Sequence, residues 1–404
     1  MILCSALRIL ELYTIVKIAY VGDFLNHGKS LQTTGTPIVI LLSLLENVDS
    51  IDVFCPKVNK DTEQFELPPK VTLQEFYTYD NSRSILGLLG IKWKNYDVVI
   101  LNMLPTGFGN KTLVNATALS IPILLVKFLR QKNIKVIYHN SVFTNDFKKL
   151  GYKSALDKIR SFFLGIVEKI LFRNIDTFVL LDLYRERITK SIGENRTRVL
   201  NSRYLEAITT MCINKMMNLE YLKVERSDTT TILMHGSWGP QKNIELGLSA
   251  LKEQKEKGAK FRLVISGGSN HHFPEYEGKF QKMLHSYSDI IDEYLGTVTE
   301  KDIMKIFLKA SLLLLPYNTP GGHSGVLEQA IFFEVPTIAI DFPEYREQAK
   351  RTTNVYFANQ DNFSSELKKH LNSLADEKKI SIRDKIMEVK INIKQLIESS
   401  NGGE

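Results

Sequence analysis

The chain alternates short apolar runs with longer stretches in which apolar residues recur every three or four positions. The runs are rich in β-branched residues and are short, which is typical of buried strands rather than helices. We expect strands over residues 16–21, 51–55, 71–76, 96–101, 134–139, 177–181, 231–236, 262–268, 289–296, 311–316, 336–340 and 354–357.

The stretches between these strands have the periodicity of helices. In residues 301–310, for example, Ile303, Met304, Phe307 and Ala310 fall on one face. Further helices are expected over residues 37–45, over 120–130 with Pro122 near the start, over 155–172 and at about 380–398. Strands that alternate with helices and are apolar nearly throughout are typical of parallel sheets covered on both faces. The fold class predicted is therefore α/β.

The strands are too numerous for one sheet, and the alternation is interrupted once. Residues 205–230 contain no clear strand and end in a polar cluster. We predict a Rossmann-like domain over 1–205, a connection over 206–230 and a second Rossmann-like domain over 231–380, and we expect the C-terminal helix to pack back on the first domain. A length of 404 residues suits two or three domains.

Composition narrows the class of protein only slightly. The chain is 44% hydrophobic and 24% charged, as globular proteins are. Three separated cysteines (Cys4, Cys55 and Cys212) exclude a disulfide framework and a cysteine-rich zinc site, and they favour the reducing cytoplasm. The net charge of +7 favours anionic partners but does not choose between nucleotides, phospholipids and nucleic acid.

The apolar N-terminus contains neither a membrane span nor a signal peptide by our interpretation. Arg8, Glu11 and Lys17 interrupt it before the roughly 18 apolar residues that a span needs, and no small-residue cleavage pattern follows a basic start. Residues 1–14 are expected to be a leader packed on the first strand. A soluble or peripheral protein is expected.

In open α/β sheets, ligands bind where strands end and loops lead into helices. After the first strand, Gly35, Thr36 and Pro37 open a helix and form a candidate anion or sugar contact, although a flexible surface loop fits equally well. This loop has neither a dinucleotide fingerprint nor a phosphate-binding P-loop. His139, at the end of a later strand, is a candidate to bind a sugar hydroxyl or a phosphate. Alternatively, it is simply a polar residue at which the strand ends.

Two loops of the second half are richer in glycine. In HGSWGPQKN (235–243), Gly236 and Gly239 allow close approach of a ligand, and Lys242 is suited to neutralise a phosphate or else is simply solvated. In PYNTPGGHSGVLEQA (316–330), glycines surround Ser324 just before a helix, so that free N–H groups can meet an anion. Glu328 lies in the first turn of that helix, near enough to accept hydrogen bonds from ribose hydroxyls; a helix capped by serine is the alternative.

The order and spacing of these segments resemble the retaining glycosyltransferases of the GT-B fold, family 4 type (glycosyl transferases group 1). The likeness covers most of the chain and is strongest over residues 231–345. It implies two Rossmann-like domains facing a central cleft and transfer of a hexose-type sugar from a nucleotide-sugar donor to a glycan or lipid-linked acceptor, with no nucleic-acid partner.

The same resemblance assigns roles to individual residues. It implies that Lys242 binds the donor diphosphate, Glu328 the ribose, and His139 the transferred sugar. Donor contacts are further implied for Gly35, Thr36, Gly236, Ser237, Gly321, Gly322, His323, Ser324, Gly325 and Val326. Two positions depart from the family pattern: Pro320 stands where a glutamate usually contacts the sugar, and Ser237 stands where an arginine usually follows the glycine of the phosphate loop.

No D-x-D sequence occurs in the chain, so neither a metal ion nor another cofactor is indicated. The departures at Pro320 and Ser237 keep a catalytically inactive homologue as an alternative, and a nucleotide-sugar epimerase on the same fold is another.

Two segments of the first domain, which the resemblance makes the acceptor-binding domain, suggest that the protein binds a membrane surface. Residues 82–94 mix Ile85, Leu86, Leu88, Leu89 and Ile91 with Arg83, Lys92, Trp93 and Lys94, and residues 147–163 place Lys148, Lys149, Lys153, Lys158 and Arg160 among aromatics. Such mixtures suit the headgroup region of an anionic bilayer, which predicts peripheral binding at the inner face of the membrane. Alternatively, the apolar residues of 85–91 pack in the core and the lysines are a solvated face.

Overall fold

The structure is a computed structural model, and it describes most of the chain. The described residues are 15–22, 35–57, 67–103, 108, 112–130, 133–139, 141–144, 155–201, 203–224, 229–270, 273–320, 322–371 and 378–398. The predicted leader (1–14), Gly321 and the basic residues Lys148, Lys149 and Lys153 lie outside the described residues.

A seven-stranded parallel sheet forms the first domain, in the order β3-β2-β1-β4-β5-β6-β7. Its strands are β1 (Val16–Val21), β2 (Val48–Pro56), β3 (Val71–Tyr77), β4 (Val98–Met103), β5 (Ile134–Tyr138), β6 (Asp176–Val179) and β7 (Thr197–Val199). Its helices are α2 (Gly35–Ser43), α3 (Ser82–Leu86), α4 (Thr112–Lys127), α5 (Ala155–Asn174) and α6 (Asp182–Ile192), with 3-10 turns η1 (Gly87–Gly90) and η2 (Trp93–Asn95). Every residue of β4 and β5 is buried, including the polar Asn102 and Lys135.

A six-stranded parallel sheet forms the second domain, in the order β11-β10-β9-β12-β13-β14. Its strands are β9 (Thr231–His235), β10 (Arg262–Ser266), β11 (Glu293–Tyr294), β12 (Leu312–Leu315), β13 (Thr337–Ile340) and β14 (Val355–Ala358). Its helices are α8 (Ile244–Glu256), α9 (Glu277–Ser286), α10 (Glu300–Lys309), α11 (Gly325–Phe332), α12 (Pro343–Gln348) and α13 (Phe363–Leu371), with η3 (Pro240–Lys242) and η4 (Pro274–Tyr276).

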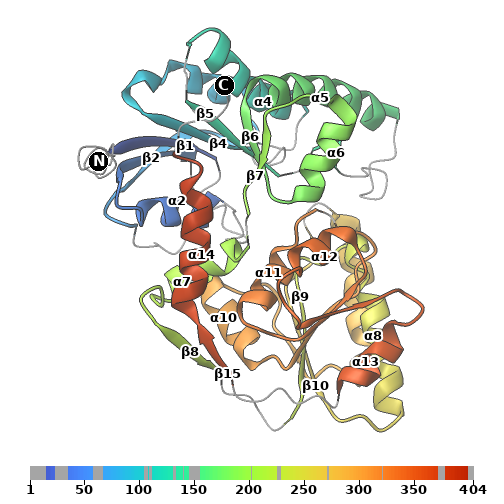
Figure 1. The fold of residues 1–404 in the computed structure, drawn as a ribbon. Coiled ribbons are helices and arrows are strands. Elements are labelled where there is room, and N and C mark those ends of the chain that lie inside the picture. Colours follow the sequence, from blue (N-terminus) through green and yellow to red (C-terminus); the bar gives the residue numbers. More distant parts are fainter. Residues whose placement is uncertain are drawn as a thin grey trace.

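Both sheets have the strand order of a Rossmann fold. The chain reverses its direction of travel between β1 and β4 in one sheet and between β9 and β12 in the other, which is where such folds bind ligands. The α/β prediction of two Rossmann-like domains is confirmed, and Figure 1 shows them one above the other.

Four further elements join the domains. The chain leaves the first sheet through α7 (Leu205–Ile213) and β8 (Tyr221–Val224), and it returns through β15 (Lys378–Ser381) and α14 (Ile382–Lys394). Strands β8 and β15 pair antiparallel, while α14 rises from the second domain to pack against α2 of the first (Figure 1). The expectation that residues 205–230 hold no strand was wrong at β8, because this short strand pairs outside both large sheets.

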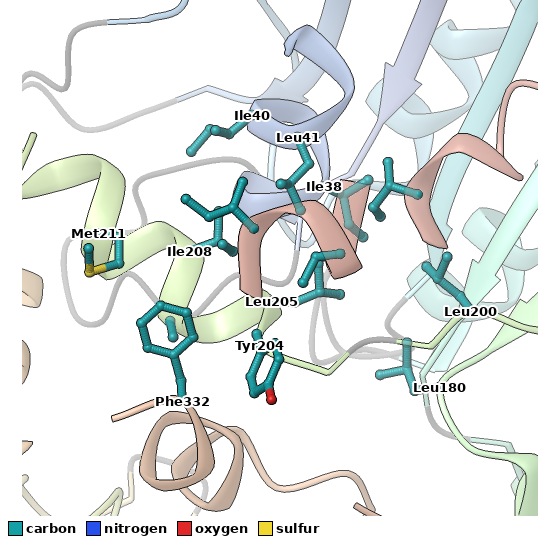
Figure 2. Close-up of a cluster of buried hydrophobic side chains, with 14 of the residues drawn as sticks. Ile38, Ile40, Leu41, Leu180, Leu200, Tyr204, Leu205, Ile208, Met211 and Phe332 are labelled. Carbon is teal, nitrogen blue, oxygen red and sulfur yellow. The ribbon is translucent and has the colours of Figure 1, made fainter. Parts of the chain in front are cut away.

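A hydrophobic cluster fastens the connection to both domains. Helix α7 lies between α2 and α11, and its Leu205, Ile208 and Met211 are fully covered (Figure 2). Tyr204, just before α7, packs edge-on against Phe332 of α11 with ring centres 5.6 Å apart. The connection is therefore a packed element whose apolar burial favours this arrangement of the domains.

Three local expectations need correction. Pro122 lies inside α4, which begins eight residues before Ser120, because Val114, Ala118 and Leu119 extend the buried face. The strand expected over 289–296 is reduced to the two residues of β11. The short strands β7 and β15 were also not predicted, since their runs are polar.

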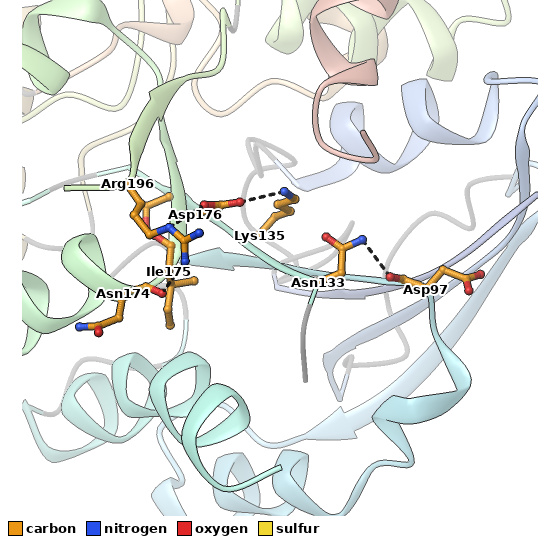
Figure 3. A network of polar contacts seen from close by, with 8 residues as sticks. Asp97, Asn133, Lys135, Asn174, Ile175, Asp176 and Arg196 are labelled. Carbon is orange, nitrogen blue, oxygen red and sulfur yellow. Dashed lines mark hydrogen bonds and ion pairs between the residues drawn. The ribbon is translucent and has the colours of Figure 1, made fainter. Parts of the chain in front are cut away.

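A buried ion pair supports the first sheet where β5 and β6 begin. Lys135 faces Asp176 across the two strands, with Nζ 3.0 Å from the carboxylate, and Arg196 approaches the same carboxylate at 3.3 Å (Figure 3). The Lys135 side chain is 1% exposed. Removing one partner of such a buried pair typically costs about 3–5 kcal/mol, so this contact holds β5 and β6 in register.

Candidate functional site

His139 follows β5 directly and lies at the carboxyl end of the first sheet. Its Nε2–H donates to Oδ1 of Asn102, which lies on the neighbouring strand β4, across 2.5 Å. The imidazole is 7% exposed, and burial lowers the pKa of His139 to about 4. His139 is therefore a neutral, oriented hydrogen-bonding group at neutral pH. Asn102 gave no sequence signal of this role, because the two residues are 37 positions apart.

Lys242 lies at the carboxyl end of the second sheet, in the loop that joins β9 to α8. Its Nζ lies 3.8 Å from the centre of the Tyr317 ring, beside the backbone of Gly236. Burial lowers the pKa of Lys242 to about 7. No carboxylate among the described residues pairs with this ammonium group, which leaves it available to an anion. Ser237 is exposed next to it, whereas Trp238 is buried against Phe280 and serves the fold.

The glycine loop before α11 is held by side chains from α12. Ser324 caps α11 by accepting from the Leu327 N–H, and its own N–H donates to Oε1 of Gln348. The ring of Tyr345 packs edge-on against that of Tyr317. The aromatic pair thereby links the Lys242 loop to the glycine loop. Gly322 has a φ of 103°, which only glycine adopts readily.

Glu328 has a contact that its sequence position did not predict. Its Oε1 accepts the N–H of Leu205 at 2.5 Å, so the carboxylate caps the start of α7. Burial raises the pKa of Glu328 well above its ordinary value, and the nearby Glu206 carboxylate adds to this rise. Oε2 makes no hydrogen bond to the described residues and lies 3.5 Å from Nε2 of His323. Oε2 is therefore the oxygen that remains for a ribose hydroxyl, while Oε1 is engaged by the start of α7.

Glu206 packs against Gly325, the first residue of α11. A side chain at position 325 would start 2.9 Å from Cγ of Glu206, so any residue other than glycine would displace the Glu206 side chain. The first backbone hydrogen bond of α11 joins Glu328 N to Ser324 O, which leaves the N–H groups of Gly325 and Val326 without a partner inside the helix. A phosphate that bound these groups would meet the Glu206 side chain nearby.

The structure brings several predicted residues of the two domains together. Burial lowers the pKa of His323 to about 3, and the nearby His139 of the other domain adds to this effect. Gly236 accompanies Lys242, and Gly322 to Glu328 form one loop and helix start. Gly35 and Thr36 open α2 as predicted and are fully buried, whereas Gly321 lies outside the described residues.

A cavity of about 690 Å³ lies between the domains. It is lined by the end of β6 and the start of α6 on one side, and by His323, Glu328 and α12 on the other. This volume suits a small-molecule ligand. Of the predicted site residues, His323 and Glu328 line it, while Lys242 and His139 do not.

Polar contacts cross from α12 to the first domain beside this cavity. The two oxygens of Glu347 accept the N–H groups of Asp182 and Leu183 at 2.5 and 3.0 Å, at the positive end of α6. Arg187 of α6 pairs with Glu344 at 2.7 Å and donates to the Thr144 carbonyl at 2.9 Å. The contacts of Glu347 and Glu344 with α6, which we call the α6–α12 clasp, hold the domains together on this side.

Comparisons with known proteins agree with this architecture. Residues 222–388 match the family model Glycosyl transferases group 1, while no curated protein matches the chain in sequence. Sucrose-phosphate synthase from Thermosynechococcus elongatus has a similar structure, with 13% identity over 95% of each chain and a TM-score of 0.63.

Two further solved structures resemble the chain along nearly its whole length. WaaG, a glycosyltransferase involved in lipopolysaccharide biosynthesis, is 13% identical over 96% of each chain, with a TM-score of 0.55. Anabaena HepE in complex with UDP and glucose is 11% identical over 95% of this chain and 94% of its own, also with a TM-score of 0.55. At such identities the likeness shows the fold alone, and the family rests on the match over the second domain. Residues 222–388 are thus a glycosyl transferases group 1 domain, and the chain as a whole has the GT-B fold.

Proposed function

We propose that the protein transfers a hexose-type sugar from a nucleotide-sugar donor to a glycan or lipid-linked acceptor, with retention of configuration and without a metal ion. The observation that carries the proposal is the ammonium group of Lys242, which faces Tyr317 and has no carboxylate partner among the described residues. A diphosphate is the anion that complements such a cation beside glycine backbone. The UDP bound by the structural neighbour HepE supports this donor class.

Lys242 would act where negative charge develops during the reaction. Transfer breaks the bond between the anomeric carbon and the diphosphate, so the leaving phosphate becomes more negative while the sugar becomes oxocarbenium-like. A preorganised cation stabilises this charge more than that of the bound donor. The leaving oxygen can take the proton of the acceptor hydroxyl, and a separate general base is then unnecessary.

The remaining donor contacts are assigned to both domains. His139, held by Asn102, would bind a hydroxyl of the transferred sugar from the first domain, with Gly35 and Thr36 at the acceptor side. The loop from Gly321 to Val326 would meet the phosphates, and Glu328 the ribose. Because Oε1 of Glu328 caps α7, the ribose contact is assigned to Oε2.

Calorimetry and product analysis test this proposal. We expect one of UDP, GDP, ADP or CMP to bind the wild-type protein, and Lys242→Ala to weaken that binding roughly 10- to 150-fold, the loss of one charge-assisted hydrogen bond. Turnover of the matching nucleotide-sugar should persist in EDTA. Absence of binding by all four nucleotides would support the inactive homologue instead, and isomerised donor formed without acceptor would support the epimerase.

We also propose that the acceptor side meets an anionic membrane surface, through α5. Segment 82–94 supports this less than expected, since Ile85, Leu88 and Trp93 are buried in the core. Helix α5 instead exposes a row of large apolar side chains: Ile159, Phe162, Phe163, Ile166 and Ile170. These positions recur every three or four residues and so share one face.

The charges around this row suit an anionic partner. Lys158, Lys169 and Arg173 are exposed on the same helix. Among the described residues no helix is long and apolar enough to cross a membrane. A basic helix with an exposed apolar face is typical of binding parallel to a bilayer surface, which would bring the cleft near a lipid-linked acceptor at the inner face of the cytoplasmic membrane.

A further inference from the structure

Glu168 is a buried carboxylate in the first domain that the proposed reaction does not use. It lies on the inner side of α5 and is fully inaccessible to solvent. Burial raises the pKa of Glu168 to about 7, although hydrogen bonds from Ser141, Tyr138 and the Val142 N–H oppose that rise. Burying an acid is costly unless its oxygens are satisfied, so the contacts of Glu168 explain why it is there.

Three donors converge on this carboxylate, and they flank His139. Tyr138, immediately before His139, donates its hydroxyl to Oε1 at 2.7 Å. Ser141, two residues after His139, donates its hydroxyl to Oε2 at 2.5 Å, and the Val142 N–H donates to Oε2 at 3.0 Å. Residues on both sides of His139 are thus tied to one group on α5, Tyr138 and Ser141 through their hydroxyls and Val142 through its backbone.

The loop that follows is fixed by the same contacts. The Ser141 hydroxyl also accepts the Phe143 N–H at 3.1 Å, and Thr144 Oγ1 donates to the Ser141 carbonyl at 3.0 Å. The His139 imidazole itself is held by its hydrogen bond to Asn102. Two anchors therefore act on His139: Asn102 on the ring, and Glu168 on the chain that carries it.

We propose that Glu168 is a positioning residue for His139: it fixes the position and orientation of the imidazole relative to the transferred sugar. This inference rests on the proposed function, in which His139 contacts the sugar. Glu168 itself touches neither donor nor acceptor. Both oxygens of Glu168 accept hydrogen bonds here, whereas an amide has one accepting oxygen and must turn its NH₂ group toward a donor. Glu168→Gln therefore keeps the volume and removes the anchor.

Kinetics on the full-length protein test the proposal. We expect Glu168→Gln to lower kcat roughly 10- to 100-fold, the size of effect that a displacement of about 1 Å produces. The Kd for the nucleoside diphosphate should stay within twofold, because Lys242 lies in the other domain. Glu194→Gln is the matched control, since Glu194 is exposed at the end of α6 and should leave both quantities unchanged. Wild-type kcat in Glu168→Gln would overturn the inference, as would equal losses of kcat and nucleotide affinity.

Two milder variants keep the test decisive if Glu168→Gln does not fold. Ser141→Ala and Tyr138→Phe each remove one donor and should each lower kcat a few-fold, again with nucleotide binding intact; wild-type kcat in both would refute the role of Glu168. The imidazole NMR signal of His139, assigned by its loss in His139→Gln, should shift in Ser141→Ala but not in Glu194→Gln. That signal does not need turnover. If the wild-type protein transfers no sugar yet the signal shifts, the proposed function fails and the positioning role stands.

Discussion

At the scale of single residues, the site depends on side chains whose ordinary charge is changed by burial. Lys242 has a pKa of about 7 in place of the ordinary value near 10.5, and His139 has a pKa of about 4. The histidine is consequently neutral throughout the physiological range. The lysine changes charge within it, so under the proposed function we expect donor binding to be sensitive to pH.

The affinity for the nucleoside diphosphate should therefore fall as pH rises. Below pH 7 Lys242 is charged and attracts the diphosphate; above pH 7 the free protein must first take up a proton, so Kd should increase by up to about tenfold per pH unit. Lys242→Arg is the control, because arginine stays charged, and its Kd should change little between pH 7 and 9. Calorimetry over this range measures both. A wild-type Kd that is constant with pH would mean that Lys242 is not the diphosphate ligand.

Two variants of Glu328 distinguish its role in capping α7 from a role in binding ribose. Glu328→Ala should lower Tm, because the start of α7 loses its cap, an effect of about 0.5–2 kcal/mol. Glu328→Gln keeps one accepting oxygen and should have a Tm close to that of the wild type. If Glu328 also binds ribose, both variants should weaken nucleotide binding. Normal affinity in Glu328→Gln together with a lowered Tm in Glu328→Ala would leave only the capping role.

At the scale of elements, the sequence predicts best those segments whose burial is continuous. The long apolar runs of β1, β4, β5, β9 and β12 identified both sheets, because a strand covered on two faces must be apolar throughout. Strands β7, β8 and β15 were missed because their residues are partly exposed and polar. The loops that carry His139 and Lys242 were recognised because parallel strands bring their carboxyl ends to one edge.

Partners of the site residues were not predictable in the same way. Asn102 and Glu168 contact His139 and its flanking residues from elements far away in sequence, and within its own segment each looks like an ordinary structural residue. The cap formed by Glu328 on α7 depends on how the connection packs against α11. Such contacts follow from tertiary geometry, and no local pattern in the sequence specifies them.

At the scale of elements, we predict that helix α5 binds the protein to anionic membranes. The protein should float with liposomes that contain anionic lipid, and high salt should weaken the association, since each charge near the surface is worth about 1 kcal/mol. Phe162→Asp combined with Phe163→Asp should abolish it by placing charge on the apolar row. Leu113→Asp is the matched control, because Leu113 is 71% exposed on α4, outside that row. Protein that never floats, with any lipid composition, would exclude the membrane proposal.

At the scale of the whole molecule, two kinds of contact set the distance between the domains. The hydrophobic cluster of α2, α7, α11 and α14 forms one side and remains buried whenever these helices stay together. The α6–α12 clasp forms the other side and consists of polar contacts that water can replace. The molecule is therefore expected to hinge at the cluster and to open at the clasp. Opening would admit the donor, and closure would exclude water from the reaction.

Weakening the clasp should shift the molecule toward the open form. Arg187→Ala removes the ion pair with Glu344, which crosses between the domains; if this pair contributes about 1–2 kcal/mol, the ratio of open to closed molecules rises roughly 5- to 30-fold. Small-angle X-ray scattering should then give a larger radius of gyration, and the KM for the donor should rise because closure becomes less favourable. Arg185→Ala is the matched control. Arg185 lies on the same helix, and its ion pair among the described residues is with Asp182 of that helix, so it does not cross between the domains. If donor-free Arg187→Ala and donor-free wild type have the same radius of gyration, the cluster alone holds the domains together and the clasp does not control opening.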